Sequence, residues 1–378
     1  MIRLHRHILV SLAGMIGMLL CGACHSTQRA PQTNKEISLE RMQGFPKGDT
    51  CLLKGVSALY AGTIGDWLVM GGGCNFPHIP AADQGKKVYY DGIYAAKLSE
   101  DDSLTWNKVG LLPEASAYGL SVTVPEGIIC VGGTSESAGL KRVIRISMEQ
   151  GSVELDSLPS LPVALDNFTG AVLDRTLYTV GGNAEGVPTD AVYALQLDAI
   201  ENGWKRLADF PGGARVQAVC AASKGKLFVW GGFLPKVQDQ LPKVYTNGYA
   251  YNPLLGEWTE VASPKDSSGV EISLGGGVAT TLTDGNILCA GGVHKDIFLK
   301  ALQGVYSGKS YLSHPAEWYQ FNKKVLVYRI ESNEWYCALQ NSHTARAGAA
   351  IVSHGEVHYL LQGERKPGIR SNEINRLK

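Results

Sequence analysis

The chain has 378 residues, and its 35 Lys and Arg residues balance 35 Asp and Glu residues, so the formal net charge is zero. This balance gives no support to nucleic-acid binding. Six of the eight cysteines lie beyond the N-terminal segment, and they form neither a CxxC pair nor a His–Cys cluster at zinc spacing. The 45 glycines are typical of an all-β chain with many tight turns.

The first residues are expected to be an export signal. Arg3 and Arg6 precede an apolar run over residues 8–20, which is too short for a membrane span of about 20 residues. Residues 22–24 are Gly-Ala-Cys, which resembles the lipobox of bacterial lipoproteins, although Cys21 stands where an aliphatic residue is usual. We therefore expect a signal peptide over residues 1–23, a tether over 24–36 and lipidation of Cys24.

This resemblance, with no Asp after Cys24, implies a cell-envelope protein that is anchored to the outer membrane through its lipid. An ordinary cleaved signal and a free periplasmic protein are the alternative.

An internal repeat follows and determines the expected fold. Five apolar runs end in a Gly-Gly pair, and a sixth ends in Gln362-Gly363. The first glycine, or Gln362, recurs at intervals of 49 to 71 residues. The runs are residues 67–70, 128–131, 177–180, 227–230, 287–290 and 358–361. Cys130 and Cys289 lie inside such runs and are expected to be buried as small apolar residues.

Each repeat continues with a variable loop, a β-rich segment, a turn and, in most copies, a strand that opens near a tryptophan. These tryptophans are Trp106, Trp204, Trp258 and Trp335. The pattern resembles the kelch motif, and the short β segments show no helical periodicity. Six copies predict an all-β, six-bladed kelch-type β-propeller over residues 37–378, each blade a four-stranded antiparallel sheet.

The sixth repeat lacks its tryptophan strand. Residues 39–46 resemble residues 204–211, which form the fourth strand of another repeat. We therefore expect residues near 38–44 to complete the last blade and to protect its exposed edge.

Antiparallel order predicts which loops share a face. The loops after the Gly-Gly pairs, including the insertions 74–90, 233–247 and 293–321, emerge on the same side as the connections between blades. Functional groups concentrate on such loops. Arg215 and Arg346, in two connections, are candidate ligand-binding residues, and a structural role is their alternative. Asn75 and Asn167 are weaker candidates on this face.

The sixth loop carries the most specific motif. Residues 363–370 read Gly-Glu-Arg-Lys-Pro-Gly-Ile-Arg, with a carboxylate and a guanidinium on either side of a Pro-Gly turn. This string is similar to the GE-x-KPG-x-R motif of the N-acetylneuraminate epimerase (sialic acid mutarotase) family. The resemblance implies that Glu364 and Arg370 are catalytic. The family carries its motif in the middle of the chain, so the chain resembles a cyclically permuted member.

Mutarotation of a cyclic hemiketal suits these residue types. The anomeric hydroxyl must lose a proton and the ring oxygen must gain one, which a carboxyl group such as Glu364 can perform. Arg370 suits the carboxylate of a sialic acid because its guanidinium binds such a group in bidentate fashion. The expected partner is thus a small sugar acid, with no metal or organic cofactor and with membrane contact only through the lipid.

Two other functions remain open from the sequence. A non-catalytic propeller would bind glycan or protein, with the aromatic-bearing insertion from Tyr306 to Phe321, including Trp318 and Tyr319, as its candidate sugar-stacking segment. A copper enzyme resembling galactose oxidase is disfavoured because no clear His/Tyr metal constellation is present.

Overall fold

The computed structural model describes residues 34–46, 51–99, 101, 103–149, 151–238, 240–266 and 268–378. Its compact unit begins at Lys35. The expected signal peptide and Cys24 lie outside the described residues. No helix within the described ranges is long and apolar enough to cross a membrane.

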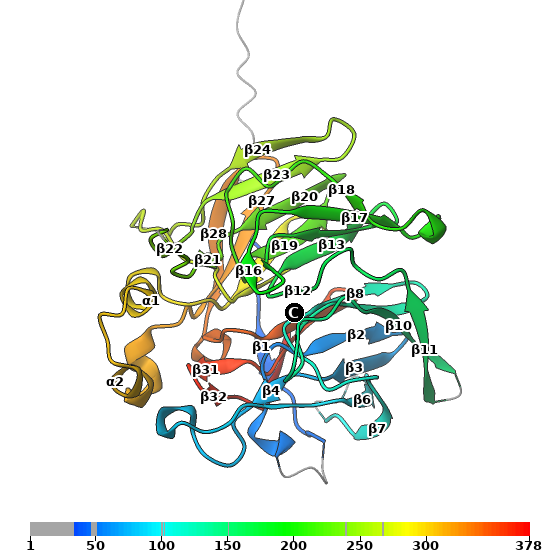
Figure 1. The fold of residues 1–378 in the computed structure, drawn as a ribbon, viewed down its shortest axis with the longest axis horizontal. Coiled ribbons are helices and arrows are strands. Elements are labelled where there is room, and N and C mark those ends of the chain that lie inside the picture. The colour runs from blue at the N-terminus through cyan, green and yellow to red at the C-terminus, as the bar shows by residue number, and fades with distance from the viewer. Residues whose placement is uncertain are drawn as a thin grey trace, which may run out of the picture. The chain divides into compact units, whose positions relative to one another are not determined.

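The described residues form an all-β fold with six four-stranded antiparallel sheets (Figure 1). The first sheet contains β2 (Tyr60–Ile64), β3 (Trp67–Gly71), β6 (Gly92–Lys97) and β7 (Trp106–Leu111). The second contains β8 (Leu120–Val124), β9 (Gly127–Val131), β10 (Val143–Glu149) and β11 (Ser152–Leu158). The third contains β13 (Thr169–Leu173), β14 (Thr176–Val180), β17 (Val192–Gln196) and β18 (Lys205–Arg206).

The other three sheets follow the same order along the chain. The fourth contains β19 (Val219–Ser223), β20 (Lys226–Trp230), β23 (Gly248–Asn252) and β24 (Glu257–Val261). The fifth contains β25 (Val278–Thr281), β26 (Ile287–Ala290), β27 (Lys324–Arg329) and β28 (Glu334–Gln340). The sixth contains β29 (Ala350–His354), β30 (Val357–Leu361), β33 (Ile374–Leu377) and β1 (Leu39–Arg41).

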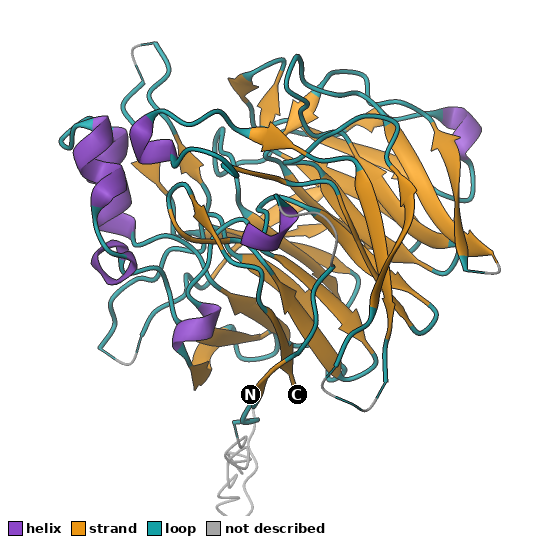
Figure 2. Ribbon diagram, turned by 90° about the horizontal axis from the view of Figure 1, so that it is seen from below, coloured by secondary structure: helices purple, strands orange, loops and turns teal. Residues whose placement is uncertain are grey.

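The sixth sheet confirms the expected contribution of the N-terminal segment. Strand β1 pairs with β33 in antiparallel register, with Leu39 opposite Leu377 and Arg41 opposite Asn375. Figure 2 shows the two ends of the described chain beside each other. The first described strand therefore covers the edge that the last strand would otherwise expose.

Burial explains why the second strand of a sheet has a continuous apolar sequence and the fourth strand an alternating one. All five residues of β9 are buried, whereas the exposed and half-buried residues of β11 largely alternate. A strand covered on both faces reads as a continuous apolar run, and a strand with one solvated face alternates. Cys130 and Cys289 are buried as expected.

The core is cyclic in its arrangement. Five buried clusters each join one sheet to the next along the chain, and a sixth joins the last sheet to the first. In that sixth cluster, Leu361 of β30 packs with Leu68 and Met70 of β3. The six sheets are therefore held together mainly by apolar burial between neighbours.

A closed cycle of six backbone hydrogen bonds links the segments that enter the sheets. In each sheet the residue two positions before the first strand donates its N–H to the carbonyl of the equivalent residue in the preceding sheet, at 2.7 to 2.9 Å. These six residues, which we name the backbone ring, are Ala58, Tyr118, Asn167, Gln217, Gly276 and Gly348. All six have positive φ, although four of them are not glycine, so the cycle of bonds holds them in a rarely occupied conformation.

Short elements fill the loops. Small sheets are formed by β4 (Cys74–Asn75) with β5 (Val88–Tyr89), β12 (Leu165–Asp166) with β15 (Asn183–Ala184) and β16 (Val187–Pro188), β21 (Phe233–Leu234) with β22 (Lys243–Val244), and β31 (Glu364–Lys366) with β32 (Ile369–Arg370). The 3-10 helices are Leu52–Lys54, Ala81–Asp83, Ile200–Asn202, Ala316–Tyr319 and Ser342–Thr344.

The insertion 293–321 contains helices, which the sequence analysis did not predict. These are α1 (Lys295–Leu302) and α2 (Gly308–Ser313), whose first turns are capped by the side chains of His294 and Ser307. Both helices lie outside the sheets, on the side of the hairpin β31–β32 (Figures 1 and 2). Lys366 of β31 bonds to carbonyls of Leu312 and His314, so this insertion and the hairpin share a face, as predicted.

Candidate functional site

The hairpin β31–β32 places Glu364 and Arg370 directly opposite each other. The chain reverses through Pro367 and Gly368, and Gly368 has φ +84°. A Cβ at Gly368 would lie 2.7 Å from the Cβ of Ala81, so both the turn and the packing require glycine. The local sequence therefore brings the acid and the cation of the motif together.

Glu364 and Arg370 form an ion pair with a separation of 2.6 Å between Oε1 and Nη1. The Arg370 side chain is 2% exposed and that of Glu364 is 22% exposed. Arg370 Nε donates to the carbonyl of Cys74 at 3.3 Å, and its guanidinium lies over the ring of Phe76 at 5.1 Å. Strand β4, in the loop between β3 and β6, and the residue after it thus hold the cation in place.

The charge of Arg370 is stabilised despite its burial. Burial by itself lowers the pKa of the guanidinium, but the carboxylate of Glu364 raises it, and the net pKa of Arg370 is above its ordinary value. The group is therefore a permanent cation that can receive an anion.

Two buried polar atoms beside Cys74 have no hydrogen-bond partner among the described residues. One is Arg370 Nη1, whose contact with Glu364 does not have hydrogen-bond geometry, and the other is Ser57 Oγ. Ser57 exchanges two backbone hydrogen bonds with Cys74, the residue whose carbonyl Arg370 also contacts. Unsatisfied buried polar groups are rare, and Arg370 Nη1 still has the carboxylate of Glu364 at 2.6 Å as its ionic partner.

Tyr118, which belongs to the backbone ring, was not among the site residues predicted from the sequence. The pKa of its hydroxyl is raised well above the ordinary value, first by burial and then by the neighbouring Cys74 and the carboxylate of Glu364, against the effect of Arg370. The charges of Glu364 and Arg370 therefore both affect the pKa of the Tyr118 hydroxyl. Its position two residues before the first strand of a sheet was the available sequence signal. The residue type at this position differs from repeat to repeat, so the position is not recognisable from any one of them.

The guanidinium of Arg346 forms its hydrogen bonds with residues next to the strands of the last sheet. Its Nη1 donates to the carbonyls of Gln362 and Glu373 at 3.0 and 2.9 Å, and its Nη2 lies 2.7 Å from Glu373 Oε2. The side chain is 2% exposed, and burial lowers its pKa to about 10.

Arg215 has the equivalent arrangement in its own repeat. Its Nη1 donates to the carbonyl of Gly231 at 2.9 Å and to Asn247 Oδ1 at 3.0 Å, and its Nη2 donates to the carbonyl of Gly212. Its guanidinium also stacks 3.8 Å from the centre of the Tyr245 ring. This geometry favours the structural alternative for both arginines, and a ligand-binding role for either remains a prediction.

The two candidate asparagines differ in their surroundings. Asn75 is buried, donates to the carbonyls of Cys51 and Gly55, and accepts from Tyr90. Asn167 belongs to the backbone ring, and its Oδ1 accepts from Gln217 at 2.7 Å. Both side chains are engaged within the protein, and their role in binding also remains a prediction.

The aromatic residues of the insertion pack on one another. His314 stacks on Trp318 at 3.9 Å between ring centres, Tyr306 stacks on Tyr311 at 5.8 Å, and Tyr319 is buried. The rings form a small satellite core at this face of the molecule.

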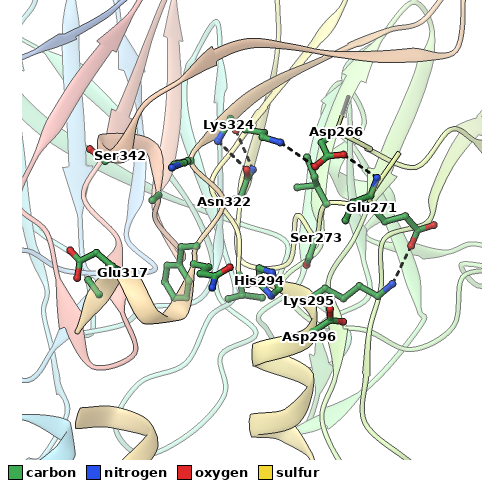
Figure 3. A pocket seen from close by; sticks show the side chains of 18 of the residues that line it. Asp266, Glu271, Ser273, His294, Lys295, Asp296, Glu317, Asn322, Lys324 and Ser342 are labelled. Atoms are coloured by element: carbon green, nitrogen blue, oxygen red, sulfur yellow. Dashed lines mark hydrogen bonds and ion pairs between the residues drawn. The ribbon is translucent and has the colours of Figure 1, made fainter. Parts of the chain in front are cut away.

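The larger of two described cavities is separate from the ion pair. It measures about 860 Å³ and lies between the insertion on one side and Asp266 and residues 270–273 on the other (Figure 3). Two of its four acidic residues are paired, with Lys324 3.4 Å from Asp266 and Lys295 3.2 Å from Glu271. Neither Glu364 nor Arg370 lines it, so volume alone does not identify the site.

The smaller cavity, of about 530 Å³, is lined by Arg370 and is basic. Its charged lining residues are Arg41, Lys54, Arg365, Arg370 and Glu373. An excess of cations around Arg370 favours an anionic ligand near the hairpin. No group of three or more His, Cys, Asp or Glu side chains within the described ranges is arranged to hold a metal ion.

Comparison with known proteins gives concordant matches. Residues 158–378, more than half of the chain, match the family described as N-acetylneuraminate epimerase. The chain is 31% identical over 229 residues to the N-acetylneuraminate epimerase of Salmonella typhi, covering 58% of each protein. It is also 31% identical over 242 residues to that of Shigella flexneri serotype 5b, covering 61% of this chain and 63% of the relative.

A solved structure of YjhT is similar as well, with a TM-score of 0.50 and 30% identity over 58% of this chain and 64% of that one. The matched part of this chain thus spans less than two thirds of the length of these relatives. Residues 158–378, which match the family, contain both residues of the ion pair.

Proposed function

Because this chain belongs to the N-acetylneuraminate epimerase family, we propose that it interconverts the α and β anomers of N-acetylneuraminate or a related acidic keto sugar. The observation that carries this proposal is the ion pair between Glu364 and the buried Arg370. An isomerase for such a sugar needs one group to move protons and one to hold a carboxylate, and this pair supplies both.

The reaction proceeds through the open-chain ketone. Glu364 removes the proton from the anomeric hydroxyl, the carbonyl forms, and the bond between the anomeric carbon and the ring oxygen breaks. The electron pair of that bond goes to the ring oxygen, which takes the proton back from Glu364. Rotation about the bond to the carbonyl carbon exposes the other face of the ketone, and the reverse sequence closes the ring as the other anomer.

Arg370 holds the sugar carboxylate during this sequence. The guanidinium is fixed by Cys74 and Phe76, so little conformational entropy is lost when a carboxylate docks. A substrate carboxylate on Arg370 replaces Glu364 as its ionic partner. Substrate binding therefore releases Glu364 for proton transfer at the moment when it is needed.

We also propose that the six sheets are the blades of a closed β-propeller whose order along the chain is permuted relative to its family. The cyclic core and the backbone ring support closure. Permutation accounts for a motif in the last sheet, and for a family match confined to residues 158–378 although the first sheet begins at Tyr60. A linear alignment of two permuted rings covers only one contiguous part of each.

Export to the cell envelope and lipidation at Cys24 remain a proposal from the sequence of residues 1–24. Metabolic labelling with a fatty-acid analogue tests it, with Cys24→Ala as the control. Label on the wild type alone supports it, and equal labelling of both proteins contradicts it.

Anomer-exchange NMR on freshly released α-N-acetylneuraminate tests the proposed activity. A catalyst accelerates the appearance of the β anomer, whereas a non-catalytic binding module would retain the sugar without changing the exchange rate. The same measurement over a panel of neutral and acidic keto sugars identifies the substrate, and we expect acceleration only with those that carry a carboxylate.

A further inference from the structure

Tyr118 occupies a position where the fold does not by itself call for tyrosine. The equivalent backbone-ring residues next to it in the cycle are Ala58 on one side and Asn167 on the other, and the ring holds two glycines elsewhere. Tyr118 has φ +62°. This conformation is energetically unfavourable for an aromatic residue and is maintained by the surrounding hydrogen bonds. A costly conformation of this kind points to a use for the side chain.

The hydroxyl of Tyr118 is held by Lys87. The Nζ of Lys87 lies 3.2 Å from Tyr118 Oη and 5.0 Å from the centre of its ring. Lys87 immediately precedes β5, which pairs with β4, so the same small sheet supports both Lys87 and the contact of Cys74 with Arg370. Because an ammonium only donates, the phenol accepts from Lys87, and its own proton is left to bond Cys74 or a bound ligand.

Hydrogen bonds connect Tyr118 to the hairpin by a short path. Tyr118 N donates to Ala58, and Ala58 N donates to Gly348. Ala347, next to Gly348, exchanges two backbone hydrogen bonds with Glu364. The charges of both Glu364 and Arg370 act on the Tyr118 hydroxyl, and the raised pKa keeps it protonated at neutral pH. Tyr118 is thus a neutral donor in the neighbourhood of the ion pair.

The proposed reaction, on which this inference rests, develops a charge that neither Glu364 nor Arg370 stabilises. When the ring opens, negative charge develops on the ring oxygen before Glu364 returns the proton. A fixed donor aimed at such an oxygen is among the largest contributions to enzyme rates. Neither Glu364, which is the base at that moment, nor Arg370, which holds the carboxylate, supplies it.

We propose that Tyr118 is a further catalytic residue, whose hydroxyl donates a hydrogen bond to the ring oxygen of the sugar as the ring opens and closes. Lys87 is its positioning residue. The ammonium of Lys87 polarises the phenol, so that the O–H becomes a stronger donor as charge develops. No proton leaves Tyr118 in this scheme, and the proton balance between the anomeric hydroxyl, Glu364 and the ring oxygen is unchanged.

Anomer-exchange kinetics of Tyr118→Phe test the proposal. We expect kcat to fall by about a hundredfold, as when one donor to a developing oxyanion is removed, with KM little changed. Lys87→Met should reduce kcat by roughly fivefold, the value of one ordinary hydrogen bond. Because Lys87 acts only through Tyr118, the double variant should be no slower than Tyr118→Phe alone.

Matched controls separate this role from a structural one. Lys86 pairs with Glu136 and is exposed, and Tyr336 lies in β28, so Lys86→Met and Tyr336→Phe should exchange anomers at the wild-type rate. A kcat of Tyr118→Phe within about threefold of the wild type, or additive effects of the two substitutions, would overturn the proposal. A wild-type protein that does not accelerate exchange would instead refute the proposed function. If Tyr118→Phe has a lower melting temperature than the wild type, its loss of activity does not distinguish the two roles. The deciding result is then whether Lys87→Met lowers kcat in the wild-type background but not in the Tyr118→Phe background.

Discussion

The side-chain oxygen of Gln362 lies 2.8 Å from the backbone nitrogen of Val56, although 306 residues separate the two in sequence. Gln362 stands where the other five repeats have the first glycine of a pair, and it has φ +55°. The glutamine thus keeps the glycine-like conformation while its fully buried side chain ties the last sheet to the first.

Gln362→Ala should therefore lower the free energy of unfolding by about 1–3 kcal/mol. The substitution leaves the buried N–H of Val56 without a partner and keeps a Cβ at positive φ. Gln362→Gly should lose less, because it relieves the backbone while losing the same bond. Urea denaturation measures all three proteins, and equal stability of Gln362→Ala and the wild type would show that this link contributes nothing.

Removal of β1 should destabilise the whole described unit. A chain that begins at Gln43 leaves β33 as an edge strand and removes Ile37 and Leu39 from the cluster that joins the fifth and sixth sheets. We expect its melting temperature to fall by more than about 5 °C relative to a chain that begins at Asn34. Circular dichroism on heating measures this, and coincident melting curves would contradict the closing role of β1.

The carboxylate of Glu373 should make stability depend on acidic pH. Burial raises its pKa, but His343, Arg346 and Arg41 outweigh burial, and the net pKa is below the ordinary 4.5. A carboxyl with a depressed folded-state pKa stabilises the fold above pH 4.5, and this contribution is lost as the pH falls through the folded-state value.

Glu373→Gln should therefore be less stable than the wild type at pH 7, and the gap should narrow below about pH 4.5. Urea unfolding at a series of pH values measures the gap. A gap that stays constant between pH 7 and pH 3 would mean that the charge of Glu373 is not what stabilises the fold.

Arg346→Met should reduce stability rather than substrate affinity. The guanidinium is almost fully buried and satisfies two carbonyls and Glu373, so its removal should cost roughly 3 kcal/mol or more. The same reasoning applies to Arg215→Met. Thermal melts and the KM for the sugar distinguish the roles, because an unchanged melt with a raised KM would identify a ligand-binding arginine instead.

Much of the fold follows from local sequence signals, and the Gly-Gly runs illustrate why. Each run is a second strand buried on both faces, so its apolar residues are continuous and its end is marked by glycines with positive φ. Residues 39–46 were also recognisable, because β1 has the sequence of a fourth strand even though it lies at the other end of the chain.

The helices α1 and α2 and the backbone ring were not predictable in this way. The insertion 293–321 occurs once, so no second copy supports its periodicity, and its aromatic residues pack on each other. Tyr118, Asn167 and Gln217 share positive φ, yet their side chains differ. The conformation is imposed by hydrogen bonds to neighbouring sheets, which are remote in sequence. For this reason the sequence did not indicate Tyr118, whereas its motif indicated Glu364 and Arg370.

The exchange rate of N-acetylneuraminate anomers with Glu364→Gln tests the central claim most directly. Gln keeps the shape of the side chain but cannot carry the proton, so NMR should show at least about a hundredfold lower acceleration than the wild type, with an unchanged melting temperature as the control. A variant that exchanges the anomers at the wild-type rate would contradict the assignment of Glu364 as the acid and base of this site.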